Sequence, residues 1–362
     1  MIKMSYAMMA AGLLGAAAAG AHGVDGHEHP STAPTAGEVT AKTTGQADMV
    51  FAWDEGLTAA LPEAARPHEP KMHGGFNEDV ETGIVYTGIP GYGLCKISPD
   101  LKTWTKIGDD PRLAWNVHGI VVFKHNGQKL IALANNNNQR VLIVDLDGNV
   151  KQEMAPPKGD EFNFDAANNY YKGAKPRFNV TDVTYLDGKL YAVTGYSPGD
   201  FVLTATEKDG TWQWGPIAWG GKGKQPGQFN TAHGVFAKDD HIYVANRQSF
   251  QVVKFTKDGK LVEVLKDIPN GSLVCNVAHT GEHFIFCPLK KVTKEQKSAP
   301  IYAHTGEALV STIVPGDLGI PVLNNIHHCW PHWVEQAEGS KQLYLLVHGW
   351  NKGKYAVLKH VK

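Results

Sequence analysis

Four histidines and a cysteine occupy corresponding places in a loose repeat along this 362-residue chain. When the repeating units are aligned, the position that opens the innermost strand of each unit is held in turn by His73, His118, Thr181, His233, Cys275 and His332. Neutral imidazole is a good ligand for zinc and copper, and three histidines with one open place is the arrangement of catalytic zinc. The pattern therefore predicts that imidazoles from distant parts of the chain meet at one metal ion.

Other interpretations of these residues stay open at this point. A single histidine at such a position is more often a hydrogen-bonded core residue, whereas three or more in register favour a metal. Cys275 is as good a candidate for a small buried hydrophobic residue as for a ligand. We expect His327 and His328 to belong to the loop that leads into the last unit, and His348 to face a turn or solvent.

The repeat itself predicts the elements that must position these side chains. The six units start near Lys71, Trp115, Phe178, Phe229, Leu273 and Cys329. The clearest copy, residues 229–265, has alternating β-rich segments and an Asp258–Gly259 turn signal. Four short strands per unit, at a period of roughly 40 to 60 residues, are typical of a β-propeller. We therefore predict an all-β fold, a six-bladed β-propeller with four-stranded antiparallel blades over residues 66–362; a β-sandwich is the alternative.

Composition and the N-terminal segment suggest where and on what the protein works. With 35 basic and 36 acidic residues the chain is nearly neutral, which excludes nucleic acid and an anionic membrane as main partners. We expect a monomer with a small-molecule substrate. Residues 1–21, with Lys3 before an alanine-rich apolar run, are predicted to be a signal peptide, so the protein would be secreted or periplasmic. Residues 22–65 are predicted to be a disordered linker and N-terminal segment.

Three long connections separate strands within or between the units. They cover residues 153–176, 209–228 and 290–325. Because each follows the third or fourth strand of a unit, we expect all three to be insertions on one face, where a propeller commonly builds its pocket.

Two segments resemble a known class of propellers. GQFNTAHGV (227–235) and VANRQSFQVVKF (244–255) resemble NHL repeats, and more closely the peptidylamidoglycolate lyases, the lyase half of the peptidylglycine α-amidating enzymes. That resemblance implies a six-bladed propeller whose zinc is held by three axial histidines in segments similar to NVHGI, NTAHGV and WPHW. Those segments carry His118, His233 and His332. It also implies a catalytic tyrosine at Tyr196, after NVTDV, and an active-site arginine at Arg247, in VANRQ.

The implied reaction splits an α-hydroxyglycine into an amide and glyoxylate. Zinc lowers the pKa of a bound hydroxyl, a phenol moves a proton, and a guanidinium holds a carboxylate. We therefore expect an exported, zinc-dependent lyase or hydrolase acting on a small oxygen-rich substrate at the propeller axis. Copper and iron are the alternative metals.

The chain departs from the family pattern at two places. The family has an acidic residue tied to a structural calcium directly after its third histidine, where this chain has Trp333, so we do not expect that calcium. The family also has an arginine in its first blade, where this chain has His73 instead. Two other functions therefore stay open: a non-catalytic NHL-type propeller that binds protein or carbohydrate, and a copper–histidine redox site.

Overall fold

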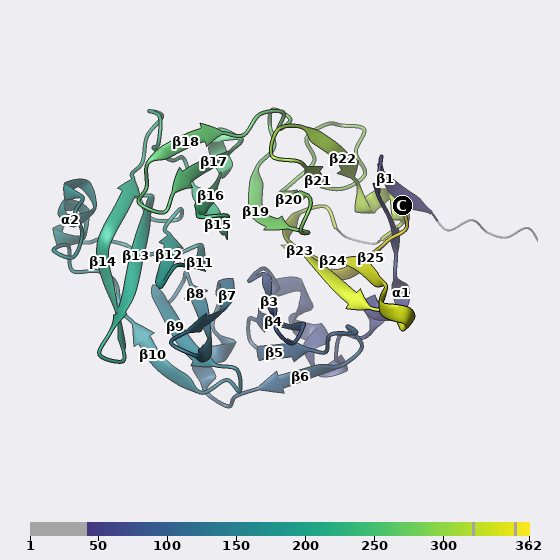
Figure 1. Cartoon of the computed structure of the whole chain (residues 1–362), viewed down its shortest axis with the longest axis horizontal. Helices are drawn as coiled ribbons and strands as arrows, with labels where there is room; N and C mark the ends of the chain where they lie inside the picture. The colour runs from purple at the N-terminus through teal and green to yellow at the C-terminus, as the bar shows by residue number, and fades with distance from the viewer. Residues whose placement is uncertain (1–41, 321–322, 351–352) are drawn as a thin grey trace, which may run out of the picture. The chain divides into compact units, whose positions relative to one another are not determined.

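The computed structural model describes residues 42–320, 323–350 and 353–362 of the chain. Within them, six β-sheets stand around a central axis like the blades of a propeller (Figure 1). The predicted all-β six-bladed propeller is thereby confirmed. The predicted signal peptide, residues 1–21, lies outside the described residues. No helix among the residues described is long and apolar enough to cross a membrane.

Blades 1 to 5 each consist of four consecutive antiparallel strands, of which the first is the innermost. Blade 1 contains β3 (Phe76–Asp79), β4 (Ile84–Ile89), β5 (Gly93–Ile97) and β6 (Trp104–Ile107); blade 2 contains β7 (Val117–His125), β8 (Gln128–Asn135), β9 (Arg140–Asp145) and β10 (Val150–Met154). Blade 3 contains β11 (Asp182–Leu186), β12 (Lys189–Val193), β13 (Phe201–Lys208) and β14 (Thr211–Gly220); blade 4 contains β15 (Ala232–Lys238), β16 (His241–Asn246), β17 (Gln251–Thr256) and β18 (Leu261–Val264). Blade 5 contains β19 (Val274–His279), β20 (Phe284–Pro288), β21 (Ile301–His304) and β22 (Leu309–Ile313).

Blade 6 closes the ring with strands from both ends of the chain. Its inner strands are β23 (Ile326–Glu335), β24 (Lys341–Gly349) and β25 (Tyr355–His360), and β2 (Met49–Trp53) and β1 (Thr43–Gln46) complete the sheet. Phe51 pairs with His360 and is fully buried. The propeller therefore begins near residue 43, earlier than the predicted 66, because these two short strands belong to the last blade and not to the repeating pattern.

The helices are short and lie in the connections. They are α1 (Glu55–Ala59) and α2 (Asp165–Lys172), with 3₁₀ segments at Glu63–Lys71, Pro111–Ala114, Arg247–Ser249, Pro315–Leu318 and Ala337–Gly339. The first predicted insertion, residues 153–176, holds α2. The other two are not insertions: residues 209–228 contain β14, and residues 290–325 contain β21 and β22. The strands β21 and β22 are short, and the pairing of β13 with β14 contains a register shift. These segments therefore show no clear strand alternation in the sequence.

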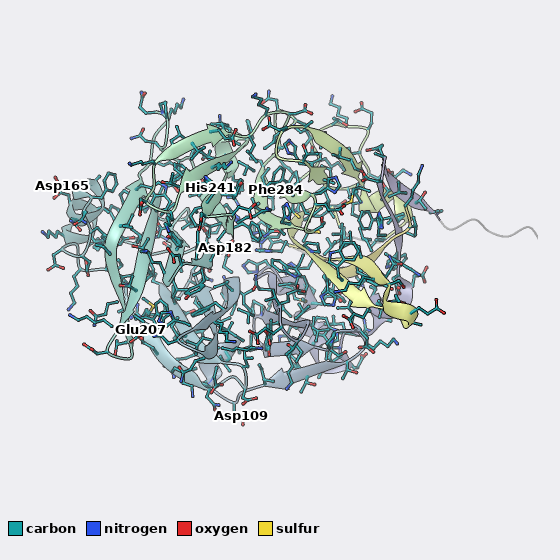
Figure 2. All side chains as sticks on the ribbon, in the orientation of Figure 1. Asp109, Asp165, Asp182, Glu207, His241 and Phe284 are labelled. Atoms are coloured by element: carbon teal, nitrogen blue, oxygen red, sulfur yellow. The ribbon has the colours of Figure 1, made fainter. Side chains whose placement is uncertain are left out.

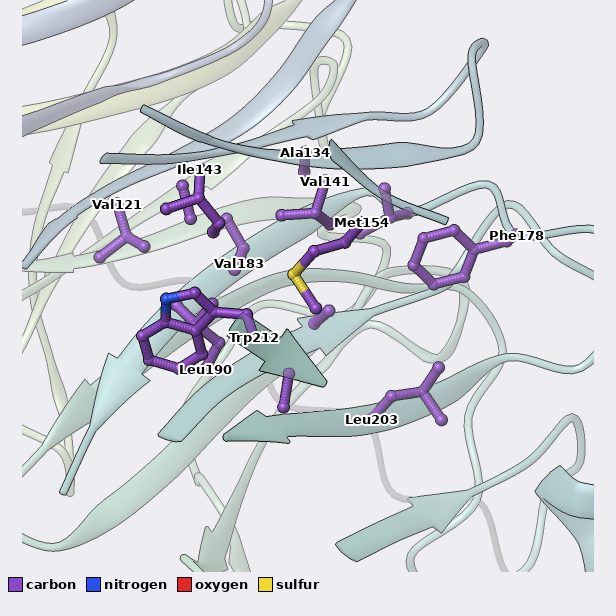
Figure 3. Close-up of a cluster of buried hydrophobic side chains, with 14 of the residues drawn as sticks. Val121, Ala134, Val141, Ile143, Met154, Phe178, Val183, Leu190, Leu203 and Trp212 are labelled. Carbon is purple, nitrogen blue, oxygen red and sulfur yellow. The ribbon is translucent and has the colours of Figure 1, made fainter. Parts of the chain in front are cut away.

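Apolar side chains fill the space between neighbouring blades. Figure 3 shows one such cluster, in which Val121 and Ile143 of blade 2 lie near Val183 and Trp212 of blade 3. Similar clusters bury the facing sides of the other blades. Contacts between successive inner strands, β3 to β7 and onward to β23 and back to β3, close a ring around the axis. The packing therefore fixes the direction in which each inner strand starts.

The inner strands share a local irregularity where they begin. In blades 2, 4, 5 and 6, the second residue of the inner strand is an extra residue that has no partner on the second strand. A bulge of this kind re-aims its side chain. The four bulge residues are His118, His233, Cys275 and His327.

Closure by the N-terminal strand predicts that Phe51 contributes strongly to stability. Phe51→Ala removes a ring that is fully buried in the core of blade 6. We expect the free energy of unfolding to fall by about 3–5 kcal/mol, measured by urea denaturation. Val262→Ala on the outer strand β18, where the side chain is exposed, is the matched control and should change stability by less than about 0.5 kcal/mol. Equal effects of the two variants would contradict this closure.

Candidate metal centre

Three histidines meet at the propeller axis. Each of His118, His233 and His327 offers a ring nitrogen, and these atoms all lie within 4.8 Å of one another. All three side chains are buried. They come from blades 2, 4 and 6, so rotational symmetry spaces them evenly around the axis. Three histidines are thus close enough together to hold one metal ion.

The other ring nitrogen of each histidine is held by the backbone of a neighbouring blade. Nδ1 lies 2.6 Å from the Thr181 carbonyl oxygen in His118, 2.8 Å from that of Cys275 in His233, and 2.9 Å from that of His73 in His327. A carbonyl only accepts, so Nδ1 must donate its proton. Each neutral ring therefore presents the lone pair of Nε2, and the bond to Nδ1 orients the ring as it does in metal sites.

Close approach between inner strands makes these hydrogen bonds reachable. Glycine follows two of the three histidines: a Cβ atom at Gly119 would stand 2.3 Å from Oδ1 of Asp182, and one at Gly234 would stand 2.5 Å from the Cys275 carbonyl oxygen. A larger residue at either place would push the neighbouring strand away. The His–Gly pairs in the sequence thus reflect the spacing that the site needs. Figure 2 shows Asp182 near the centre of the ring.

Burial keeps the three imidazoles uncharged. It lowers the pKa of His118, His233 and His327 well below the ordinary value of 6.5, and nearby histidines, with Arg247 for His118 and His233, lower it further. At neutral pH the rings are therefore in the form that binds a metal.

Tyr196 and Arg247 lie beside this group, on the side of blades 3 and 4. The Tyr196 hydroxyl is 3.0 Å from Nε2 of His233, and Arg247 donates from Nη1 to the same hydroxyl over 3.0 Å. Burial raises the pKa of Tyr196. The ion pairs that arginines make among the described residues involve Arg66, Arg112 and Arg140, so no described carboxylate pairs with the buried Arg247. A buried cation without a carboxylate favours an anionic ligand.

His73 lies next to the three histidines but outside their group. Its ring centroid is 5.1 Å from that of His118 and 5.3 Å from that of His327. Its Nδ1 donates to the Lys71 carbonyl oxygen over 2.7 Å. The predicted ligand on blade 1 is thus beside the site, on the segment that leads into β3.

The structure does not bring His332 to the cluster. It lies five residues beyond His327 on β23, about 16 Å away at the usual rise of a strand. Its Nδ1 is 2.7 Å from Oε2 of Glu78 and its Nε2 is 2.8 Å from the Pro99 carbonyl oxygen. There it borders a pocket of about 820 Å³, which Trp333 also lines. This pocket is at the far end of the strands from the histidine cluster.

His327, expected in a loop, takes the axial place in blade 6 because the bulge falls there. The sequence holds a signal for it: Asn325–Ile326–His327 matches Asn116–Val117–His118, with asparagine two residues before the ligand. The residue after the third axial histidine is then His328 and not Trp333. Neither side chain carries a carboxylate.

A second histidine pair lies behind the cluster in the same blade. His328 and His348 are partners across β23 and β24, and both are buried: His328 lies in a strand and not in the expected loop, and His348 does not face a turn or solvent. The backbone N–H of Gly75 donates to Nε2 of His348 over 3.2 Å, and no described residue bonds Nδ1 of either ring. Burial lowers the pKa of His348 to about 3. Burial also lowers the pKa of His328 well below 6.5, so both rings are neutral at neutral pH.

Comparison with known proteins finds matches among solved structures alone. No family model matches the chain, and no curated protein matches it. Among solved structures, one described as "Streptogramin B lyase structure" matches with a TM-score of 0.48 and 12% sequence identity, over 80% of this chain and 94% of that one. The class that the coordinates themselves define is a six-bladed β-propeller with a histidine cluster at its axis. Nothing about the activity of this chain follows from the match.

The geometry predicts which histidines a metal needs. His118→Ala, His233→Ala and His327→Ala should each lose bound metal after metal-replete expression and desalting, because each removes one of three converging nitrogens. We expect a loss of affinity greater than the roughly 10–100-fold caused by losing an outer-shell partner. His332→Ala is the matched control and should keep about one metal per chain, measured by elemental analysis. Metal lost from His332→Ala but kept by His327→Ala would contradict this assignment.

The buried His348 predicts acid sensitivity of the metal-free protein. At pH 5 this ring stays neutral in the folded state, while in the unfolded chain, with its ordinary pKa of 6.5, it is mostly protonated. Because the unfolded state binds more protons, stability falls as the pH falls below 6.5. This group alone should cost about 2 kcal/mol between pH 7 and pH 5.

The check compares unfolding free energies in urea at the two pH values. His348→Gln should show a pH-dependent loss about 2 kcal/mol smaller than the parent. Gln251→Ala, a change on β17 of a side chain that does not titrate, should leave that loss unchanged. An identical loss in all three proteins would show that His348 titrates normally.

Proposed function

We propose that the axial histidines bind zinc and that the protein is an exported lyase acting on a small carboxylic acid with an oxygen on the carbon next to the carboxyl group. The observation that carries this proposal is the convergence of three histidine ring nitrogens within 4.8 Å of one another, beside a tyrosine hydroxyl and a buried arginine. The resemblance of the VANRQ and NTAHGV segments to peptidylamidoglycolate lyases supports the same reaction class.

The donor set fits zinc. Three neutral imidazoles whose Nδ1 atoms donate to carbonyls leave a fourth place for water or substrate. Nε2 of His233, which now faces the Tyr196 hydroxyl, would help to hold the ion, and the hydroxyl would then keep its bond with Arg247. A bound zinc would supply Lewis acidity that lowers the pKa of a substrate hydroxyl.

Arg247 and Tyr196 fit two parts of the reaction. The guanidinium would hold the substrate carboxylate in a bidentate pair, which also neutralises its buried charge. The phenol of Tyr196 would give its proton to the leaving nitrogen as the C–N bond breaks, and the resulting phenolate would take up the proton of the substrate hydroxyl. An N-acyl-α-hydroxyglycine then gives one amide and one glyoxylate, with no oxidant or reductant consumed.

A copper redox site is the second candidate, and His73 is the observation that favours it. Its ring lies against those of His118 and His327, so a small movement of the segment before β3 would offer a fourth imidazole. Four imidazoles suit Cu(II) in tetragonal geometry. Electron paramagnetic resonance of the protein as isolated discriminates between the metals, because Zn²⁺ gives no signal.

The lyase reaction predicts glyoxylate release from N-acyl-α-hydroxyglycines by the zinc-loaded protein. Tyr196→Phe should lower kcat by about 10²–10⁴-fold while metal stays bound, because only proton transfer is lost. Arg247→Gln should raise KM as well, because it removes the carboxylate partner. Tyr185→Phe, a change of a tyrosine stacked on Phe123 between blades 3 and 2, is the matched control.

Two results would contradict this function. Zinc-loaded protein that releases no glyoxylate from any such compound would exclude the lyase. In that case, retained binding of a carboxylate ligand would favour the non-catalytic binding propeller. Equal kcat values for Tyr196→Phe and Tyr185→Phe would remove Tyr196 from the reaction.

A further inference from the structure

We propose that Trp350 and His73 form a subsite, across the axis from Arg247, for an aromatic acyl group and the N–H that joins it to the substrate. This inference rests on the proposed function only in taking Arg247 as the carboxylate partner. It names the substrate class more closely: an α-oxygenated acid whose nitrogen carries an aromatic acyl group.

Trp350 and Arg247 occupy the same place in their blades. Each is the first residue after the second strand, since β16 ends at Asn246 and β24 ends at Gly349. Those two strand ends pair with Ala232 and Ile326, the residues that directly precede the axial histidines of blades 4 and 6. Both side chains therefore begin at the same end of the strands, next to the axial histidines. Each follows a residue that pairs with the neighbour of an axial histidine.

The contacts of the two side chains place them on different sides of the metal group. Arg247 reaches Tyr196 in blade 3 and Cys275 in blade 5. The Trp350 ring lies 6.4 Å from the ring of His73 and 6.3 Å from that of His327. His73 leads into blade 1, which is three blades away from blade 4 and thus directly across the axis from Arg247.

The exposure of Trp350 leaves a ring face for a ligand. Trp350 is 40% exposed, and its ring is tilted against the ring of His327 in the metal group and that of His73 beside it. Lone exposed apolar residues are ordinary on a protein surface, so exposure alone says little. Beside a buried cation and three converging imidazoles, however, an open indole face offers stacking to one part of the molecule that binds there.

His73 supplies the polar part of the subsite. Its Nδ1 donates to the Lys71 carbonyl oxygen, so in the neutral ring Nε2 is an acceptor. No described residue donates to that Nε2. An N–H between the central carbon of the substrate and its acyl group would lie on this side when the carboxylate is on Arg247. The site thus matches a carboxylate, an oxygen, an N–H and an aromatic ring in that order.

Binding of non-reactive analogues to the metal-loaded protein tests the subsite. N-benzoylglycine and N-acetylglycine both carry the carboxylate and the N–H, and differ only in the group offered to Trp350. By titration calorimetry, the parent should bind N-benzoylglycine about tenfold more tightly. Trp350→Ala should bind the two compounds equally, with the affinity for N-acetylglycine unchanged, and Trp350→Phe should keep most of the preference.

The matched control is Trp333→Ala. Trp333 is 42% exposed, close to the 40% of Trp350, but lines the pocket at the far end of the strands. It should keep the full preference for the benzoyl compound. For His73, the comparison is with O-benzoylglycolate, which replaces the N–H by an ester oxygen. The parent should bind this ester several-fold more weakly than N-benzoylglycine, and His73→Ala should bind the two alike.

The outcomes separate this inference from the proposed function. Trp350→Ala with the parent's preference, or a parent that does not bind N-benzoylglycine, overturns the subsite whether or not glyoxylate is released. A Trp350-dependent preference without any glyoxylate release supports the subsite and discards the lyase reaction. Loss of binding in Trp350→Ala for both compounds, with normal metal content, would show a structural role for the indole and would also overturn the subsite.

Discussion

The site depends on one interaction, the hydrogen bond from Nδ1 of each axial histidine to a backbone carbonyl of a neighbouring blade. For His118 and His233 the acceptor is the residue that holds the equivalent place at the start of another inner strand, Thr181 or Cys275. The bond therefore couples the direction of a ligand to the packing distance between blades. Metal affinity and blade packing should change together in variants that alter that distance, for example at Gly119.

The buried charged side chains near the site differ in their partners: the carboxylates accept from backbone N–H groups, and the proposed partner of Arg247 is the substrate. The nearby buried carboxylates serve the backbone: Asp200 accepts from the N–H groups of Thr231 and Ala232, and Asp182 accepts from that of Val235. Burial raises the pKa of Asp182 to about 8, so this group adds little negative charge at neutral pH. None of these carboxylates neutralises Arg247. Because no described carboxylate pairs with Arg247, its buried positive charge is the strongest reason to propose an acid as the ligand of this site.

The sequence predicted the fold because turns and strand alternation are local signals. Asn126 and Gly127 have φ of 48° and 79°, as their turn signal requires. His118 and His233 could be predicted because each opens the innermost strand of a repeating unit and is followed by glycine. Blade 6 offered two histidine segments, and the choice of His327 over His332 depends on a bulge against β24 that pairing alone determines. The strand of Phe51 was missed because five residues far from the repeat carry no periodic signal.

The bulge residues and the residues just after the second strands have different roles in the proposed site. Bulge residues are fixed by strand pairing and blade packing, and three of the four, His118, His233 and His327, bring a ring nitrogen to the metal group whatever the substrate. The residues just after the second strands are not so constrained: the equivalent positions hold Asn136, Arg247, Leu289 and Trp350 in blades 2, 4, 5 and 6. Such loop positions carry specificity on a rigid scaffold. One cation and one indole at equivalent places, reaching toward different blades, would let a substrate with two unlike ends bind in one orientation.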